Sequence, residues 1–161
     1  MIEVPTATLH ASAVLVGARA VLIRGPSGAG KSRLALELIE AARAGRLLFA
    51  RLVGDDRVHL QTAGQRLLVR PAEALCGFIE VRGLGIVRMP YETGAVVGLV
   101  VDLAAAAQRL PEPEERQVEV AGIRLPRLAV AAGTAALPLL LMMLTLRPEG
   151  IHEAAGSASQ E

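Results

Sequence analysis

An eight-residue segment constrains this chain more than any other part of the sequence. It consists of Gly25, Pro26, Ser27, Gly28, Ala29, Gly30, Lys31 and Ser32, and it fits the pattern G-x-x-x-x-G-K-[ST] at every position. The apolar run Ala20–Ile23 before it predicts a buried strand, and residues 31–43 after it carry apolar side chains at helical spacing. Such a pattern marks a phosphate-binding loop when a strand precedes it and a helix follows it. The sequence therefore predicts a nucleotide phosphate site at residues 25–32.

The residue types in this phosphate loop suit an oxyanion. Glycines let successive N–H groups turn toward one ligand, because a Cβ there would clash or forbid positive φ. The helix that begins near Lys31 directs its unpaired N–H groups to the same point. We expect Lys31 to contact the β- and γ-phosphates of ATP and the Ser32 hydroxyl to bind Mg²⁺. Lys31 is the only lysine among 17 Lys and Arg residues, and its compact ammonium differs physically from the guanidinium used elsewhere.

Composition narrows the class of protein. With 161 residues, 52% hydrophobic and 2% aromatic, the chain predicts one domain with an aliphatic core over residues 1–150, followed by a flexible tail over 151–161. A net charge of +1 gives no electrostatic basis for nucleic-acid binding. The single Cys76 cannot form an internal disulfide, and residues 1–20 lack the pattern of a secretory signal. We expect a cytoplasmic protein.

One segment raises the possibility of a membrane span. Residues 128–146 contain no charged side chain, and a segment of 19 residues is long enough to cross a bilayer. However, Ala and Gly fill its first half and Pro138 interrupts the second. We favour a buried helix preceded by a loop, with no membrane partner.

Apolar periodicity and turn residues predict a mixed α/β sheet with flanking helices. The expected strands are residues 2–4, 12–16, 20–24, 58–60, 66–70, 78–81, 95–103 and a pair within 117–125. The expected helices are residues 31–43, 104–110 and 135–144, with a helical turn within 71–76. Gly45 suits a left-handed cap after the first helix.

Two adjacent carboxylates follow the apolar run that ends at Val53. Asp55 and Asp56 are two of only three aspartates in the chain. A carboxylate at the end of a strand beside a phosphate loop commonly holds Mg²⁺ or orients the attacking group. The same letters, Gly54-Asp55-Asp56-Arg57, also suit a solvated turn. Spacing alone leaves both interpretations open.

A second polar pair lies at residues 80 and 82. Glu80 and Arg82 are two apart in a strand-like segment, so their side chains face the same way. They suit a metal carboxylate and a phosphate clamp, or a surface ion pair. The three histidines lack the spacing of zinc ligands. His10 precedes the first predicted hairpin and could reach the phosphate site from there.

Absent motifs exclude several classes of protein. The chain contains no Asn, so the Asn-Lys-x-Asp element that reads guanine is missing. It also contains no Leu-Ser-Gly-Gly-Gln element of transporter ATPases and no Gly-x-Ser-x-Gly element of acyl transfer.

Three segments in order resemble the catalytic domain of the HPr kinase/phosphorylase family. They are the phosphate loop, Leu-Val-Gly-Asp-Asp-Arg-Val at residues 52–58, and Ile-Glu-Val-Arg-Gly-Leu-Gly-Ile-Val at residues 79–87. The Glu-x-Arg-Gly-Leu-Gly block is the most specific of the three, and His10 stands where the family has a histidine. The resemblance implies a phosphate-loop mixed sheet of the HPr kinase C-terminal-domain type.

The resemblance also implies a role for each candidate residue. Asp55 would take the proton of a substrate serine, and would return it when inorganic phosphate attacks the phosphoserine, with Asp56 in support. His10 is included with these catalytic candidates. Ser32, Glu80 and Asp55 would hold Mg²⁺. Arg82 would contact the transferring group.

Further expectations follow from the same resemblance. The substrate would be an HPr-like phosphocarrier protein, the donor ATP, and the assembly a homo-oligomer, a hexamer in the family. Longer members have an additional N-terminal domain, so this chain resembles a short form. Arg127 is the nearest match to an arginine that the family keeps late in its sequence.

Two other functions remain open. A small-metabolite kinase would need a lid with several arginines, for which Arg116, Arg124 and Arg127 are candidates. A non-catalytic ATP-binding regulatory module would use the phosphate loop without phosphoryl transfer.

Overall fold

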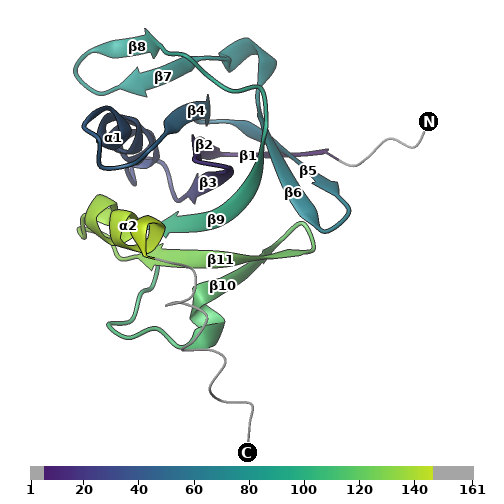
Figure 1. The fold of residues 1–161 in the computed structure, drawn as a ribbon, viewed down its shortest axis with the longest axis vertical. Helices are drawn as coiled ribbons and strands as arrows, with labels where there is room; N and C mark the ends of the chain where they lie inside the picture. The colour runs from purple at the N-terminus through teal and green to yellow at the C-terminus, as the bar shows by residue number, and fades with distance from the viewer. Residues whose placement is uncertain (1–5, 147–161) are drawn as a thin grey trace, which may run out of the picture.

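The computed structural model describes residues 6–146, which form a mixed sheet of nine strands, a separate two-stranded hairpin and two α-helices (Figure 1). The first strands and the first helix are β1 (Thr6–Leu9), β2 (Ala11–Val16), β3 (Arg19–Arg24), α1 (Lys31–Arg43) and β4 (Ala50–Gly54). The next are β5 (Val58–Ala63), β6 (Arg66–Pro71), the 3₁₀ turn η1 (Glu73–Leu75), β7 (Phe78–Val81) and β8 (Gly85–Arg88). The last are β9 (Ala95–Leu103), the 3₁₀ turn η2 (Pro113–Arg116), β10 (Gln117–Val120), β11 (Ile123–Val130) and α2 (Ala136–Thr145).

The centre of the sheet is parallel, and this places the site. β3 and β11 both run parallel to β9, with Arg24 opposite Asp102 and Val130 opposite Leu103. On the other side of β3, β2 and then β4 continue the sheet in antiparallel order. The strands therefore run β4, β2, β3, β9 and β11 from top to bottom in Figure 1. Because β3, β9 and β11 are parallel, their carboxyl ends meet at one edge of the sheet, where open α/β sheets bind ligands.

Both helices pack on one face of this sheet (Figure 1). Along β3, Val21 and Ile23 face the helices, whereas Ala20 and Leu22 belong to the core on the opposite face. This alternation is the two-residue period of a strand that is covered on both faces. The face of α1 that carries Leu34 and Leu38 is buried against the sheet and holds the helix directly after the phosphate loop.

Most of the predicted elements are confirmed. The hairpin of β2 and β3, the helix over residues 31–43, the hairpin of β5 and β6, the strand over 95–103 and the pair of β10 and β11 all form. Gly45 has φ 77° and follows the end of α1 as predicted. The predicted strand at residues 2–4 and the predicted tail at 151–161 lie outside the described residues.

One prediction for the middle of the chain is wrong, and one strand there was missed. Residues 104–110 form no helix, because Ala104 has φ 51° and the N–H of Ala105 donates to the carbonyl of Val130, which ties the chain to β11. β8 (Gly85–Arg88), which pairs with β7 in the separate hairpin, was not among the predicted strands.

The uncharged segment 128–146 comprises the end of β11, a loop and α2. Leu140 and Leu141 are buried against α1 and the sheet, whereas Leu139 and Met142 are exposed. The expected loop and helix are therefore present, but only one face of the helix is buried. Across residues 6–146, no helix combines the length and the apolar character that a membrane crossing would require.

Candidate functional site: a phosphate loop beside a buried carboxylate

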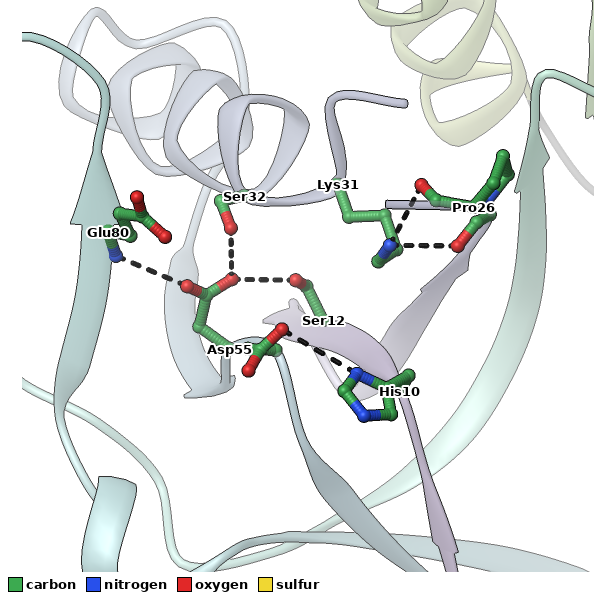
Figure 2. A network of polar contacts seen from close by, with 9 residues as sticks. His10, Ser12, Pro26, Lys31, Ser32, Asp55 and Glu80 are labelled. Atoms are coloured by element: carbon green, nitrogen blue, oxygen red, sulfur yellow. Dashed lines mark hydrogen bonds and ion pairs between the residues drawn. The ribbon is translucent and has the colours of Figure 1, made fainter. Parts of the chain in front are cut away.

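The phosphate loop connects β3 to α1 with strained backbone that its glycines permit. Gly25 has φ 156°, and a Cβ at that position would lie 3.1 Å from both the Cβ and the carbonyl oxygen of Leu103. Gly30 has φ 98° and precedes the first residue of α1, so the chain turns sharply into the helix. The Lys31 ammonium donates to the carbonyls of Gly25 and Pro26 at 2.8 and 3.1 Å, which places this cation over the loop (Figure 2).

Asp55 forms the polar centre next to this loop. Its Oδ1 accepts hydrogen bonds from the hydroxyls of Ser12 and Ser32, each at 2.7 Å, and its Oδ2 accepts from the N–H of Glu80 at 3.2 Å (Figure 2). The residue is 4% exposed. The end of β4 therefore delivers a buried carboxylate directly to the last residue of the phosphate loop. The interpretation of this position as a solvated turn is wrong.

Asp56 and His10 form the solvent-exposed side of the same centre. The Asp56 side chain is 67% exposed, and the backbone of this residue has φ 66°. The interpretation of the segment as a solvated turn therefore holds for Asp56. Its Oδ1 lies 3.7 Å from Nδ1 of His10, which is exposed on the turn between β1 and β2. Because Asp56 directly follows Asp55 in the chain, this contact brings His10 close to Asp55, as Figure 2 shows.

Glu80 and Arg82 come from the hairpin of β7 and β8. Glu80 lies on β7, and its main-chain N–H donates a hydrogen bond to Oδ2 of Asp55. Arg82 follows in the exposed turn. The hairpin therefore brings the Glu-x-Arg-Gly-Leu-Gly block to the site. Two contacts here were not expected from the sequence: the buried Ser12 hydroxyl and the main-chain N–H of Glu80, both bonded to Asp55. A serine in an apolar strand was the only sequence signal for the first.

The donor set suits a hard cation. Ser32, Asp55 and Glu80 offer only oxygen atoms, and Mg²⁺ is usually held by one or two carboxylates together with the phosphates of its substrate. Because the Ser32 hydroxyl donates its proton to Asp55, its oxygen lone pairs stay available to a cation. Within residues 6–146 no cluster of three or more His, Cys, Asp or Glu side chains could hold a metal by itself. The residues present therefore fit Mg²⁺ that arrives with a nucleotide.

A second charged cluster lies at the ends of the parallel strands, and sequence reasoning missed it. Asp102 accepts from Arg24 Nε at 2.7 Å and from its Nη2 at 2.9 Å, and from Arg127 Nε at 2.6 Å. Burial raises the pKa of Asp102, but the hydrogen bonds and charges of the two guanidiniums outweigh it and hold the pKa below its ordinary 3.8. Arg24 directly precedes Gly25, so this network fixes the entry to the phosphate loop. Arg127 is held here rather than on a lid.

Fold and site together define a phosphate-loop α/β domain in which a buried carboxylate from a neighbouring strand contacts the loop's serine. Residues 4–133 match the family described as the HPr Serine kinase C-terminal domain. The chain belongs to this family.

Individual relatives agree with this assignment. The chain is 35% identical over 143 residues to an HPr kinase/phosphorylase of Geobacillus thermodenitrificans strain NG80-2, an alignment that covers 78% of this chain and 42% of the relative. It is 34% identical over 143 residues to an HPr kinase/phosphorylase of Limosilactobacillus reuteri strain DSM 20016, and this alignment covers 81% of this chain and 42% of that relative. The chain thus spans less than half the length of these relatives.

A solved structure shares the fold. The Hpr(Ser) kinase/phosphatase from Coxiella burnetii superposes with a TM-score of 0.68 at 24% identity, covering 96% of this chain and 99% of the other. The expected fold class, a mixed phosphate-loop sheet of the HPr kinase type, is confirmed.

Proposed function

We propose that this chain is an ATP-dependent serine kinase that acts on an HPr-like phosphocarrier protein, with phosphorolysis of the phosphoserine as its second activity. Membership of the family and the names of its relatives support the reaction class. The single observation that carries the proposal is the Asp55 carboxylate, buried and hydrogen-bonded at 2.7 Å to Ser32 of the phosphate loop. Phosphoryl transfer depends on this kind of fixed placement and charge neutralisation more than on covalent help.

The loop and the surrounding oxygens divide the binding work. The N–H groups of residues 27–32 at the loop and the N-terminus of α1 bind the phosphates together with the Lys31 ammonium. Ser32, Asp55 and Glu80 hold Mg²⁺, which neutralises charge on the β- and γ-phosphates when it is bound. Arg82, exposed at the hairpin turn, contacts the transferring group.

Asp55 is the proposed base. The serine oxygen of the substrate forms a bond to the γ-phosphorus as the bond from that phosphorus to the ADP oxygen breaks, and the serine proton passes to the Asp55 carboxylate. In the reverse sense, inorganic phosphate attacks the phosphoserine, pyrophosphate forms, and Asp55 returns the proton to the serine oxygen. The Ser12 and Ser32 hydroxyls and the Glu80 N–H fix the orientation of this carboxylate, with two of the three hydrogen bonds on Oδ1 and one on Oδ2. Asp56, with His10, supports this step from the solvent side.

Transfer to a defined acceptor tests the proposal. The protein is incubated with radiolabelled ATP, Mg²⁺ and HPr, with the Asp55→Asn variant as control. Label on an HPr serine, lost in the variant, is the expected result. Label on small metabolites would instead establish a metabolite kinase, and ATP binding without transfer would establish a regulatory module.

The structure weakens one of these alternatives. A metabolite kinase lid would use Arg116, Arg124 and Arg127, yet these residues lie on η2 and β11, and Arg127 is bonded to Asp102.

We further propose a homo-oligomer, hexameric by resemblance, that works in the cytoplasm where ATP is present. Sedimentation velocity of the purified chain tests the assembly.

A further inference from the structure

The cluster of Arg24, Asp102 and Arg127 has no role in the reaction proposed above, yet it lies at the entry to the phosphate loop. Arg24 is the last residue of β3 and lies opposite Asp102 near the end of β9. This is the last pair in the register that joins the two strands. Beyond Arg24 the chain leaves the sheet and becomes the loop, so the side chain of Arg24 is the final tie between the strands before the loop begins.

The geometry of this tie is rigid. Nε and Nη2 of Arg24 donate to different oxygens of Asp102, at 2.7 and 2.9 Å. A two-point pair of this kind fixes the orientation of the guanidinium as well as adding energy. Arg127, on β11, lies on the far side of β9 and donates to Oδ2 of the same carboxylate at 2.6 Å. Asp102 is therefore held from one side and holds Arg24 on the other.

The residue after Arg24 directs the lysine of the loop. Gly25 packs so closely on Leu103, the residue after Asp102, that a Cβ there would lie 3.1 Å from the Leu103 carbonyl oxygen. The carbonyl of Gly25 accepts a hydrogen bond from the Lys31 ammonium at 2.8 Å (Figure 2). The end of β9 thus holds Arg24 by its side chain and Gly25 by its backbone, and Gly25 in turn holds Lys31.

Breaking the pair would release this arrangement. The Arg24 and Asp102 side chains are mostly buried, and a charge left unpaired in such a place is costly. The remaining partner would turn toward water and loosen the end of β3. Because hydrogen bonds weaken steeply as their angles depart from linear, a shift of the Gly25 carbonyl would leave the Lys31 ammonium poorly directed.

We propose that Arg24 and Asp102 are positioning residues for phosphate binding, whose ion pair fixes the Gly25 carbonyl and through it the Lys31 ammonium. Neither residue touches the phosphates, and Arg127 supports the pair from β11. This inference rests on the proposed function for the identity of the bound group.

The opposite charges of the two residues distinguish positioning from simple attraction. Arg24→Gln removes a positive charge from the neighbourhood of an anion site, whereas Asp102→Asn removes a negative charge. If these charges acted on the phosphates only through space, the first change would weaken binding and the second would strengthen it. If the pair positions the loop, both changes weaken binding.

Equilibrium binding of tripolyphosphate with Mg²⁺ tests the proposal, at a temperature where thermal unfolding shows every variant to be folded. Each single variant should raise the Kd by about tenfold or more, the loss expected when a charge-assisted hydrogen bond to the ligand is misdirected. A double variant that combines Arg24→Gln with Asp102→Asn should bind about as weakly as either single variant, because each change alone already breaks the pair.

Leu67→Ala is the matched control for stability. Leu67 is a fully buried residue of β6, which pairs with β9 at residues 95 and 96, the end of that strand remote from Asp102. Its truncation should destabilise the protein to a similar degree, since it leaves a cavity in the core. The Kd for tripolyphosphate should nevertheless be unchanged.

Other outcomes overturn the inference. Unchanged or tighter binding by Asp102→Asn would show that the pair does not position the loop. Equal weakening in Leu67→Ala would attribute the effect to general loss of stability. A loss in the double variant equal to the product of the two single losses would show that the residues act separately.

Transfer of label to HPr serine, measured on the same proteins, separates this inference from the proposed function. Transfer by the unmodified chain together with normal binding by Asp102→Asn would refute the inference and leave the kinase function standing. The expected binding pattern without any transfer to serine would support the positioning role and refute the kinase function. Absence of tripolyphosphate binding by the unmodified chain would refute both.

Discussion

Replacing Asp55 by Asn separates the chemical role of this residue from its structural role. The amide keeps one oxygen, which can still accept from Ser12 and Ser32 in place of Oδ1. Its NH₂ group then faces the N–H of Glu80, so a hydrogen bond is lost and two donors oppose each other in a site that is 4% exposed. Such an unsatisfied buried donor costs about 1–3 kcal/mol. For a chain of this length, the melting temperature should fall by about 2–12 °C.

The effect of Asp55→Asn on catalysis should be larger than its effect on stability. Loss of a general base lowers transfer by roughly 10²–10⁴-fold, whereas binding of the nucleotide phosphates should change little. The measurements are the rate of label transfer to HPr serine, the Kd for ATP and the thermal unfolding midpoint.

Ser12→Ala is the matched control for Asp55→Asn. It removes one buried hydrogen bond from the same carboxylate but keeps the carboxylate, so it should lose comparable stability and far less activity. Transfer by Asp55→Asn at the rate of the unmodified protein would remove Asp55 from the mechanism. Equal loss of transfer in both variants would mean that the geometry of the site, rather than a base, limits the rate.

Three further predictions follow from neighbouring charges. Lys31→Ala should abolish measurable ATP turnover, and normal kinetics in this variant would contradict the phosphate-loop assignment. Asp56→Asn should change the free energy of unfolding by less than about 0.5 kcal/mol, because the side chain is 67% exposed. It should also lower the rate of phosphoryl transfer less than Asp55→Asn does; a larger loss in Asp56→Asn would make Asp56 the base and Asp55 the supporting residue. Asp102→Asn should lower the free energy of unfolding by about 2–4 kcal/mol in chemical denaturation near neutral pH, because it leaves Arg24 and Arg127 without their charged partner. The side chains of these arginines are 27% and 22% exposed, so we expect a loss slightly smaller than that for a fully buried ion pair. Because folding lowers the pKa of Asp102, its contribution to the free energy of unfolding should be complete above about pH 4 and lost as the pH falls further. On acidification, Asp102→Asn should therefore lose less stability than the unmodified chain. Parallel plots of stability against pH for the two proteins would contradict the pairing of Asp102 with the arginines.

Local patterns in the sequence were sufficient to predict the elements around the loop. The helix over residues 31–43 was predicted with the observed bounds, because its apolar spacing, the preceding Gly30 and the following Gly45 all act within a few residues of its ends. The hairpin of β2 and β3 was likewise predictable from two apolar runs and a Gly17 turn. The candidate residues Asp55, Glu80 and His10 were found through motif letters, and the structure brings them together.

Contacts between distant segments were not predictable in the same way. Ser12 lies within an apolar strand, and only the pairing of Ala13 with Gly54 places its hydroxyl beside Asp55. That pairing includes a shift of register between residues 13 and 14, which a single sequence does not reveal. The helix expected over 104–110 failed for a related reason, because a positive φ at Ala104 and a bond to β11 override the helical preference of four alanines.

The distribution of the three aspartates shows how register decides chemistry. Asp102 lies at the end of the strand adjacent to the phosphate-loop strand, opposite Arg24. From its place in the sheet alone, this carboxylate would be expected to reach a metal bound to the loop. Two guanidiniums instead surround it, and a carboxylate already paired with two cations has little remaining attraction for a third. Asp55, whose donors are neutral hydroxyls and an N–H, keeps its full negative charge available to a cation. The arginines at 24 and 127 therefore commit Asp102 to holding the strand ends together, and this leaves Asp55 as the buried aspartate that can serve both metal and substrate.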